Sequence, residues 1–336
     1  MRKFIQTIQN IWKIEDLRQR LLTTLLFVLI YRFGSFVVLP GIDPTALTAL
    51  QAQTAGGLMA LLDMFSGGAF SNASIFALGI MPYISASIVI QLLTIAVPYF
   101  QKMQKEGESG RQKMNQITRY LTVAILLFQG PSYLVNLSVQ MAQAGQAVAV
   151  GFNWFTISST ILLCAGSMFV MWLGERITDR GIGNGISFII LIGIIARFPA
   201  ALVQEFSSRL NEGGGLMLFI LEIIILLFVF AFAILLVQGT RRIPVQYAKR
   251  MVGNKQYGGV RQYIPLKVNS ANVMPIIFAQ AIMFIPIALA GFSTSESASA
   301  FTRAFMNNDG FWYNAVFALL IIVFTYFYTA IIINPV

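Results

Sequence analysis

LGIMPYISASIVIQLL, residues 78–93, is apolar enough to form most of a membrane span, but its side chains are unsuited to lipid on every side. Its polar side chains are those of Ser85, Ser87 and Gln91. Its helix-weakening residues are Gly79 and Pro82. Ile80, Ile84 and Ile88 recur every four residues and therefore form one aliphatic stripe on a helix. Such a span is typical of an internal boundary, such as the wall of a pathway that is sometimes wet and sometimes sealed.

The composition places the chain in a membrane. Of its 336 residues, 57% are hydrophobic and only 11% are charged. A soluble domain could not bury so much apolar surface, so lipid must cover part of it. Residues 1–20 are polar and basic and lack the apolar core of a signal peptide. We expect them to form a cytoplasmic amphipathic helix.

The residue types limit the chemistry that the chain can perform. It has no histidine and one cysteine, Cys164, which excludes histidine-based triads, Cys/His zinc sites and an internal disulfide. Cys164 lies in an apolar run, where it is either a small buried hydrophobe or a reactive thiol. We therefore expect no catalytic residues, no metal site and no cofactor, and predict that the chain is not an enzyme.

The hydrophobic pattern predicts an all-α polytopic membrane protein. We expect eight spans, each close to the ~20 residues that a bilayer requires. They are residues 21–38, 74–97, 120–139, 153–173, 185–203, 215–238, 271–292 and 312–333.

Lys and Arg gather in every second connection between these spans. The basic regions are the N-terminus and loops 98–119, 174–184 and 239–270, and the basic residues elsewhere are Arg32, Arg197, Arg209 and Arg303. By the positive-inside rule, the basic regions and the N-terminus face the cytoplasm. Loop 239–270 also has Val, Tyr and Ile runs around Gly-Asn and Gly-Gly, which predict a short β-hairpin. This loop either docks a cytoplasmic partner or only determines topology.

A half-length apolar segment precedes the second span. GLMALLDMFSGGAF, residues 57–70, has a short helical pattern that ends at Gly67 and Gly68. It is too short to span a bilayer, so it is either a re-entrant element or a helix on the membrane surface. Irregular backbone at membrane depth is tolerated only inside protein or beside water.

Several long blocks identify the chain as resembling the SecY family, the central subunits of bacterial protein-conducting channels. The blocks are MFSGGAFSNASIFALGIMPYISASIVIQLL at 64–93, KEGESGRQKMNQITRY at 105–120, MWLGERITDRGIGNGISFIIL at 171–191, RRIPVQYAKR at 241–250, IPLKVNSANVMPIIFA at 264–279 and FYTAIIINP at 327–335. The resemblance implies ten spanning helices in two halves around an hourglass pore. Eight of the ten are present here, five in residues 21–203 and three in 204–336, and the last two are expected to be missing.

The resemblance also assigns a plug at residues 57–72 and a ring of pore residues. The plug residues are Leu58, Leu61, Leu62, Met64, Phe65, Ser66, Gly67 and Gly68. The pore-ring residues are Ile80, Ile84, Ile186, Ile190 and Ile277. Aliphatic rings exclude water and ions by dewetting, although isoleucines also serve to pack helix against helix.

A lateral gate and a docking surface are implied in the same way. The gate residues are Ser85, Ser87, Gln91, Asn272 and Gln280, for which ordinary contacts between helices are the alternative. The docking residues are Arg241, Arg242, Lys249 and Arg250. The implied partners are the SecE and SecG subunits, the SecA ATPase, the ribosome, signal peptides and nascent chains, YidC, SecDF and anionic lipids. The implied location is the bacterial inner membrane.

The expected function is passive translocation of unfolded preproteins and lateral release of membrane-protein helices, driven by SecA or the ribosome. A secondary transporter with inverted repeats is the alternative, and it would need clustered charge within the membrane. Glu222, in the sixth span, is such a charge, and is either a paired structural group or part of a proton relay. Arg32, near the outer end of the first span, is expected to snorkel.

Overall fold

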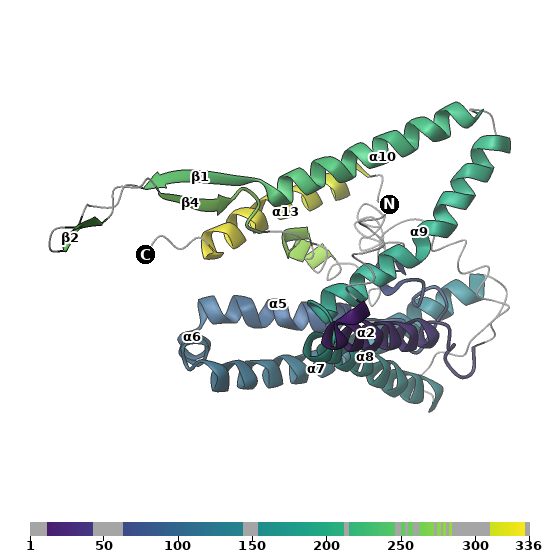
Figure 1. The fold of residues 1–336 in the computed structure, drawn as a ribbon. Coiled ribbons are helices and arrows are strands. Elements are labelled where there is room, and N and C mark those ends of the chain that lie inside the picture. Colours follow the sequence, from purple (N-terminus) through teal and green to yellow (C-terminus); the bar gives the residue numbers. More distant parts are fainter. Residues whose placement is uncertain are drawn as a thin grey trace. The chain divides into compact units, whose positions relative to one another are not determined.

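The computed structural model shows a mainly helical chain (Figure 1). It describes residues 12–42, 63–143, 154–211, 215–245, 250–252, 255–257, 262–271, 274–276, 278–279, 282–283 and 310–332. The helices are α2 (Glu15–Gly34), α5 (Met81–Ala96), α6 (Pro98–Lys105), α7 (Glu108–Gln143), α8 (Trp154–Arg180), α9 (Gly185–Asn211), α10 (Gly215–Gln238) and α13 (Phe311–Ile332). The strands are β1 (Thr240–Val245), β2 (Arg250–Val252), β3 (Lys255–Tyr257) and β4 (Gln262–Lys267).

The chain divides into two compact units. The first is Met1–Ala201 with Phe284–Asn314, and the second is Leu202–Met283 with Ala315–Val336. The expected domains at 1–20, 21–203 and 204–336 stay predictions. Residues 15–20 of the expected N-terminal helix belong to α2, which continues into the first predicted span, whereas residues 1–11 lie outside the described part of the chain.

The expectation of a multi-pass membrane protein is confirmed. Four described helices, within α8, α9, α10 and α13, are long and apolar enough to cross a membrane, or five spans if α5 and α6 form one bent span. The predicted spans at 21–38 and 120–139 coincide with parts of α2 and α7. Most of 271–292 lies outside the described residues. The number eight therefore stays a prediction.

Helix α5 begins later than the sequence predicts. A span was expected at 74–97, but residue 74 forms a β-bridge, residues 75–80 form turns and the helix starts at Met81. Gly79 has a φ of +54°, a left-handed conformation that a helix cannot continue through. Pro82 lies in the first turn of α5, where a missing N–H costs nothing. These two residues therefore set the start of the helix.

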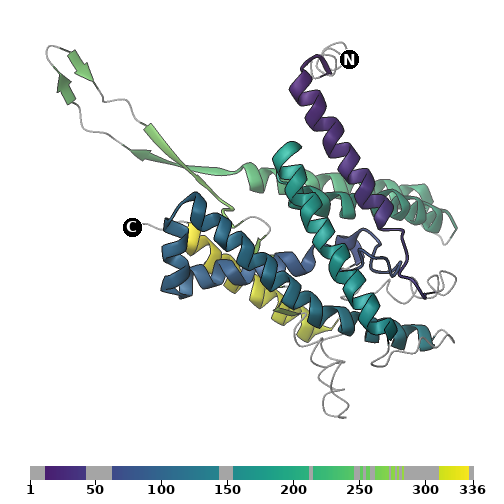
Figure 2. The ribbon, with the colours of Figure 1, turned by 90° about the horizontal axis from the view of Figure 1, so that it is seen from below.

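The basic connection 98–119 is largely helical instead of a loop. Val97 is extended, as expected before a proline, and Pro98 starts α6. Helices α5, α6 and α7 form a hairpin in which α5 and α7 lie side by side (Figure 1 and Figure 2). Helix α7 is also joined to α8, because Arg119 and Glu175 form an ion pair at 2.7 Å.

The core of the first unit joins α7 and α8 to the chain before and after the half-length segment. Its fully buried members include Leu39, Ala73, Leu134 and Leu163. Helix α8 approaches this chain closely at Gly166, where a Cβ atom would lie 2.2 Å from the carbonyl oxygen of Ile75. Small residues at such contacts let helices in membranes pack tightly.

The second unit contains α10, the β-strands, the end of α9 and most of α13. Phe206 of α9 packs against Phe219 of α10 with ring centroids 5.2 Å apart, and Phe278 stacks on Phe324 of α13 at 5.2 Å. No residue of α10 is buried, and apart from Glu222 and the terminal Gln238 its side chains are apolar on every side. Such a helix is suited to contact with lipid.

A two-stranded ribbon continues from the end of α10 (Figure 1). Strand β1 pairs antiparallel with β4, and β2 pairs antiparallel with β3. Prolines lie in both strands of the first pair, where Pro244 faces Tyr263 and Pro265 faces Arg242. The hairpin predicted for loop 239–270 is confirmed.

Replacing Gly166 tests the close contact between α8 and residue 75. We expect Gly166→Leu to lower the free energy of unfolding by about 1–3 kcal/mol, since the side chain must displace backbone. Ala165→Leu is the matched control, because Ala165 is exposed and adjacent on the same helix. Thermal unfolding in detergent measures both variants, and equal midpoints would contradict the described packing.

Candidate functional site

The half-length segment is buried although most of it is not helical. We call its described part, residues 63–72, the plug segment; Leu58, Leu61 and Leu62 lie outside the described residues. Residues 63–66 are helical, and the chain then turns at Gly67 and Gly68, whose φ values are +66° and +91°. Seven of the ten residues are buried, so their backbone groups need partners within the protein.

Side chains of the plug segment supply some of these partners. The Ser66 hydroxyl donates to the Asp63 carbonyl at 3.1 Å and accepts from the Phe70 N–H at 3.0 Å. The Ser71 N–H donates to Asp63 Oδ1 at 2.8 Å. These bonds close residues 63–71 into a compact loop.

Helix α2 binds the plug segment through two neighbouring side chains. The Tyr31 hydroxyl donates to the Ser66 carbonyl at 3.2 Å, and Arg32 Nη1 donates to the Gly67 carbonyl at 2.8 Å. The Arg32 guanidinium also lies 5.4 Å from the ring centroid of Phe36. The charged end of Arg32 thus bonds to a buried carbonyl, and its snorkelling stays a prediction.

Helix α7 holds the other end of the segment. The buried Tyr133 hydroxyl donates to the Phe70 carbonyl at 2.9 Å, and the two rings meet edge to face at 4.8 Å. Residue 38 forms a bridge with Ser74, and the Leu39 N–H donates to the Ala73 carbonyl at 2.9 Å. The segment is thus bound to α7, and the residues directly after it are bound to the chain that follows α2.

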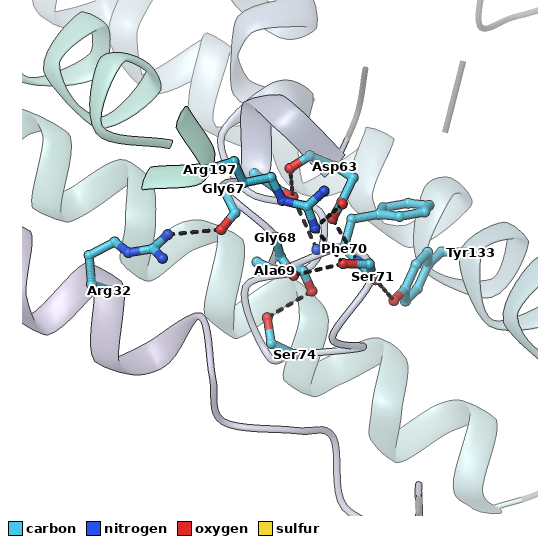
Figure 3. A network of polar contacts seen from close by, with 11 residues as sticks. Arg32, Asp63, Gly67, Gly68, Ala69, Phe70, Ser71, Ser74, Tyr133 and Arg197 are labelled. Carbon is cyan, nitrogen blue, oxygen red and sulfur yellow. Dashed lines mark hydrogen bonds and ion pairs between the residues drawn. The ribbon is translucent and has the colours of Figure 1, made fainter. Parts of the chain in front are cut away.

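Helix α9 contributes the charged contact (Figure 3). Arg197 forms an ion pair with the Asp63 carboxylate, and its Nη2 donates to the Ser71 hydroxyl at 2.8 Å. Burial raises the pKa of the Asp63 carboxyl above its usual value, while the Ser71 N–H and the Arg197 charge oppose this shift. The charged form of the Asp63 carboxyl is therefore stabilised by the Ser71 N–H and the Arg197 guanidinium.

The same face of α9 carries the expected pore residues. A Cβ atom on Gly193 would lie 2.6 Å from the Phe65 carbonyl oxygen, so the helix and the plug segment touch there. Ile186, Ile190, Gly193 and Arg197 follow each other at steps of four, three and four residues. At 3.6 residues per turn, these steps place all four on one face of α9.

The chain directly before the expected pore residues of the second span also contacts the plug segment. Ile80 directly precedes α5 and Ile84 lies in its first turns, and both are buried. A Cβ atom on Gly79 would lie 3.8 Å from Ser66, so the chain just before Ile80 contacts the segment. The fifth expected member, Ile277, lies outside the described residues.

The lateral-gate and docking residues are described only in part. Ser85, Ser87 and Gln91 are half-buried on α5, whereas Asn272 and Gln280 lie outside the described residues. Arg241 and Arg242 are exposed on β1, and Arg250 begins β2. Lys249 lies outside the described residues.

Glu222 is paired within the second unit. Its Oε1 accepts from Arg209 at 2.6 Å, and Arg209 also donates to Glu205 at 2.8 Å. The structure thus agrees with the interpretation of Glu222 as a paired structural group that joins α9 to α10.

Sequence reasoning missed Tyr31, Asp63, Tyr133 and Arg197 as residues that hold the plug segment. A signal existed for two of them, since Arg197 is one of four basic residues outside the basic regions of the sequence and Asp63 is the one acidic residue in 57–72. Nothing in the sequence distinguishes the two tyrosines. The described residues contain no group of three His, Cys, Asp or Glu side chains suited to a metal, and Cys164 is a half-buried free thiol.

The comparisons with known proteins agree on one family. The sequence model of the SecY family matches residues 74–336. The protein translocase subunits SecY of Streptomyces scabiei and Aquifex aeolicus are 43% and 42% identical to the chain, over 96% and 98% of it. The chain covers 76% and 77% of their lengths.

Solved structures show the same fold. A protein-conducting channel matches with a TM-score of 0.52 at 18% identity, over 82% of this chain and 58% of that one. A structure that concerns the plug domain of SecY, described as stabilising the closed state, matches with a TM-score of 0.54 at 18% identity, over 82% of this chain and 58% of that one. The chain thus spans less than two thirds of these channel proteins.

The fold is that of a membrane channel for proteins. The chain belongs to the SecY family of protein translocase subunits. This assignment favours the channel over the secondary transporter that the sequence left as an alternative.

Removing the Tyr133 hydroxyl tests the attachment of the plug segment to α7. We expect Tyr133→Phe to lower the free energy of unfolding by about 0.5–1.5 kcal/mol, because the Phe70 carbonyl loses one of its two hydrogen bonds. Tyr120→Phe is the matched control, since Tyr120 is exposed on the same helix. Equal losses in thermal unfolding would contradict the role given to Tyr133.

Proposed function

We propose that this chain forms the closed state of a passive protein-conducting pore, with the plug segment as its seal. The observation that carries the proposal is the position of the segment, which contacts α2, α7, α9 and the chain before α5 through named residues. A seal for a pore must be held by several spanning helices and still consist of backbone that can leave as a unit. The irregular, serine-rich segment meets both requirements.

The constriction is formed by Ile80, Ile84, Ile186, Ile190 and Ile277. Two observations support this part of the proposal: Ile186 and Ile190 share the face of α9 that contacts the plug segment, and Ile80 follows the contact at Gly79. Aliphatic side chains exclude water by dewetting and make no directional bonds. Unfolded chains of many sequences can therefore slide between them.

Apolar segments leave the pore sideways, through a gate that Ser85, Ser87 and Gln91 line on α5. Asn272 and Gln280 are the expected partners on the seventh span. Hydrogen bonds between helices in membranes are worth about 0.6–2 kcal/mol each. Bonds of that strength suit a seam that must open when an apolar segment arrives.

We expect the chain to be a passive pore, so the energy for transport comes from partners. The exposed arginines on β1, with Arg250 at the start of β2, suit docking of the SecA ATPase or of the ribosome, because guanidinium groups bind both carboxylates and RNA phosphates. SecE and SecG complete the channel, with YidC and SecDF as further partners. The N-terminus and the ribbon face the cytoplasm of a bacterial inner membrane that contains anionic lipids.

Polar substitution of the ring tests the constriction. In the complete channel, Ile84→Ser with Ile190→Ser should raise the ion leak of reconstituted vesicles and relax the requirement for an intact signal sequence, because polar side chains keep the constriction wet. The control variant, Ile84→Val with Ile190→Val, keeps the constriction apolar, so its ion leak should stay as low as that of the unaltered channel. An unchanged leak in the serine variant would refute the assignment of these residues to the ring.

Charge reversal tests the docking surface. Arg241→Glu with Arg250→Glu should weaken binding of SecA or of the ribosome at physiological salt by about tenfold or more, since each reversal turns attraction into repulsion. Arg241→Lys with Arg250→Lys keeps the charge and should retain most of the affinity. If the unaltered protein and the two double variants bind with equal dissociation constants, the ribbon is not a docking surface and serves only to determine topology.

A further inference from the structure

The contacts that hold the plug segment differ in kind. Those from Tyr31, Arg32 and Tyr133 all end on backbone carbonyls. Such acceptors are present whatever the side chains of the segment are. Among the described contacts to the segment, the one between Arg197 and Asp63 joins two opposite charges. This contact therefore depends on the particular side chain that the segment carries.

Arg197 also ties both ends of the folded loop at once. Its guanidinium reaches the Asp63 carboxylate and the Ser71 hydroxyl, and the Ser71 N–H donates to the same carboxylate at 2.8 Å (Figure 3). One turn earlier on α9, Gly193 lets the helix approach the Phe65 carbonyl. With a side chain at residue 193, the helix would have to move away from the segment. The two α9 residues thus form one seat for the plug segment.

The two partners of the ion pair are buried to very different extents. The Asp63 side chain is 1% exposed and that of Arg197 is 45% exposed. If Arg197 is removed, a buried carboxylate loses its countercharge, which strongly destabilises the closed arrangement. If Asp63 is neutralised, the guanidinium keeps contact with its surroundings and loses less. When the segment leaves its seat, the carboxylate regains water, which offsets the loss of the pair.

We propose that Arg197 is a positioning residue that sets how readily the channel opens. The ion pair between Arg197 and Asp63 holds the plug segment on α9, and a signal sequence must provide enough binding free energy to break it. The strength of this pair thereby contributes to the discrimination between chains with and without a functional signal sequence. This inference rests on the proposed function of the chain as a sealed pore.

The experiment uses the complete channel complex in vesicles, with ion conductance without substrate as one measurement. Transport of a preprotein with an intact or a defective signal sequence is the other. Arg197→Gln should raise the resting conductance by about tenfold or more and admit the defective preprotein. Asp63→Asn should have a smaller effect. The double variant should leak less than Arg197→Gln alone, because no buried charge is then left unpaired.

Arg209→Gln is the matched control, since Arg209 lies on the same helix and pairs with Glu222 and Glu205 instead of with an acidic residue of the plug segment. It should leave conductance and signal selectivity unchanged. If Arg197→Gln does not accumulate, Arg197→Lys replaces it. Lysine keeps the charge but loses the second contact to Ser71, so an intermediate leak is expected.

The outcomes separate this inference from the proposed function. Suppose that the unaltered complex transports preproteins, and that Arg197→Gln or Arg197→Lys has the same resting conductance and the same signal selectivity as the unaltered complex. Arg197 then does not determine how readily the channel opens, and the inference is wrong. The same holds if the double variant leaks more than Arg197→Gln by the amount that Asp63→Asn adds alone, since additive effects mean that the two residues act independently. If the unaltered complex transports no preprotein, the proposed function itself is wrong.

Discussion

Irregular backbone can lie among membrane-spanning helices only if its N–H and C=O groups find partners within the protein. Residues 63–72 meet this condition with hydrogen-bond partners from two sources, their own side chains and those of neighbouring helices. Ser66 and Asp63 serve groups inside the segment, while Tyr31, Arg32 and Tyr133 supply donors from α2 and α7. The arrangement of the first unit around the segment follows from this need. Its helices bring hydrogen-bond donors as well as apolar surface to the place where the segment lies.

The same condition explains why the segment is suited to movement. The backbone N–H and C=O groups of a spanning helix form hydrogen bonds within the helix and need no partners from neighbouring helices. The plug segment instead depends on hydrogen-bond donors from α2 and α7. Its carbonyls can exchange these donors for water once it reaches an aqueous space, so the bonds that fix it inside the protein do not oppose its presence outside.

The elements that could be predicted from the sequence are those whose signal is local. Helix α10 was expected at 215–238 and observed at Gly215–Gln238, because a run of this length with Glu222 as its one charged residue has one reasonable interpretation. The strands of the ribbon were predicted from turn residues between β-branched runs. The late start of α5 was missed, since the left-handed φ of Gly79 shows only when the chain before it is folded.

The ion pair between Asp63 and Arg197 was also missed, because it joins residues far apart in the sequence. The family resemblance supplied the ring, plug and gate residues, and their roles stay predictions.

The prolines of the ribbon restrict how it can be recognised. A two-stranded ribbon has an edge on each side, and such edges commonly attract a further strand from another chain. Pro244 in β1 and Pro265 in β4 each remove one N–H from this pair of strands. A strand added along either edge would therefore be interrupted, which protects an exposed ribbon from pairing with copies of itself. Any protein that binds it must recognise the side chains, and the specificity of that contact is set by their charges instead of by backbone pairing.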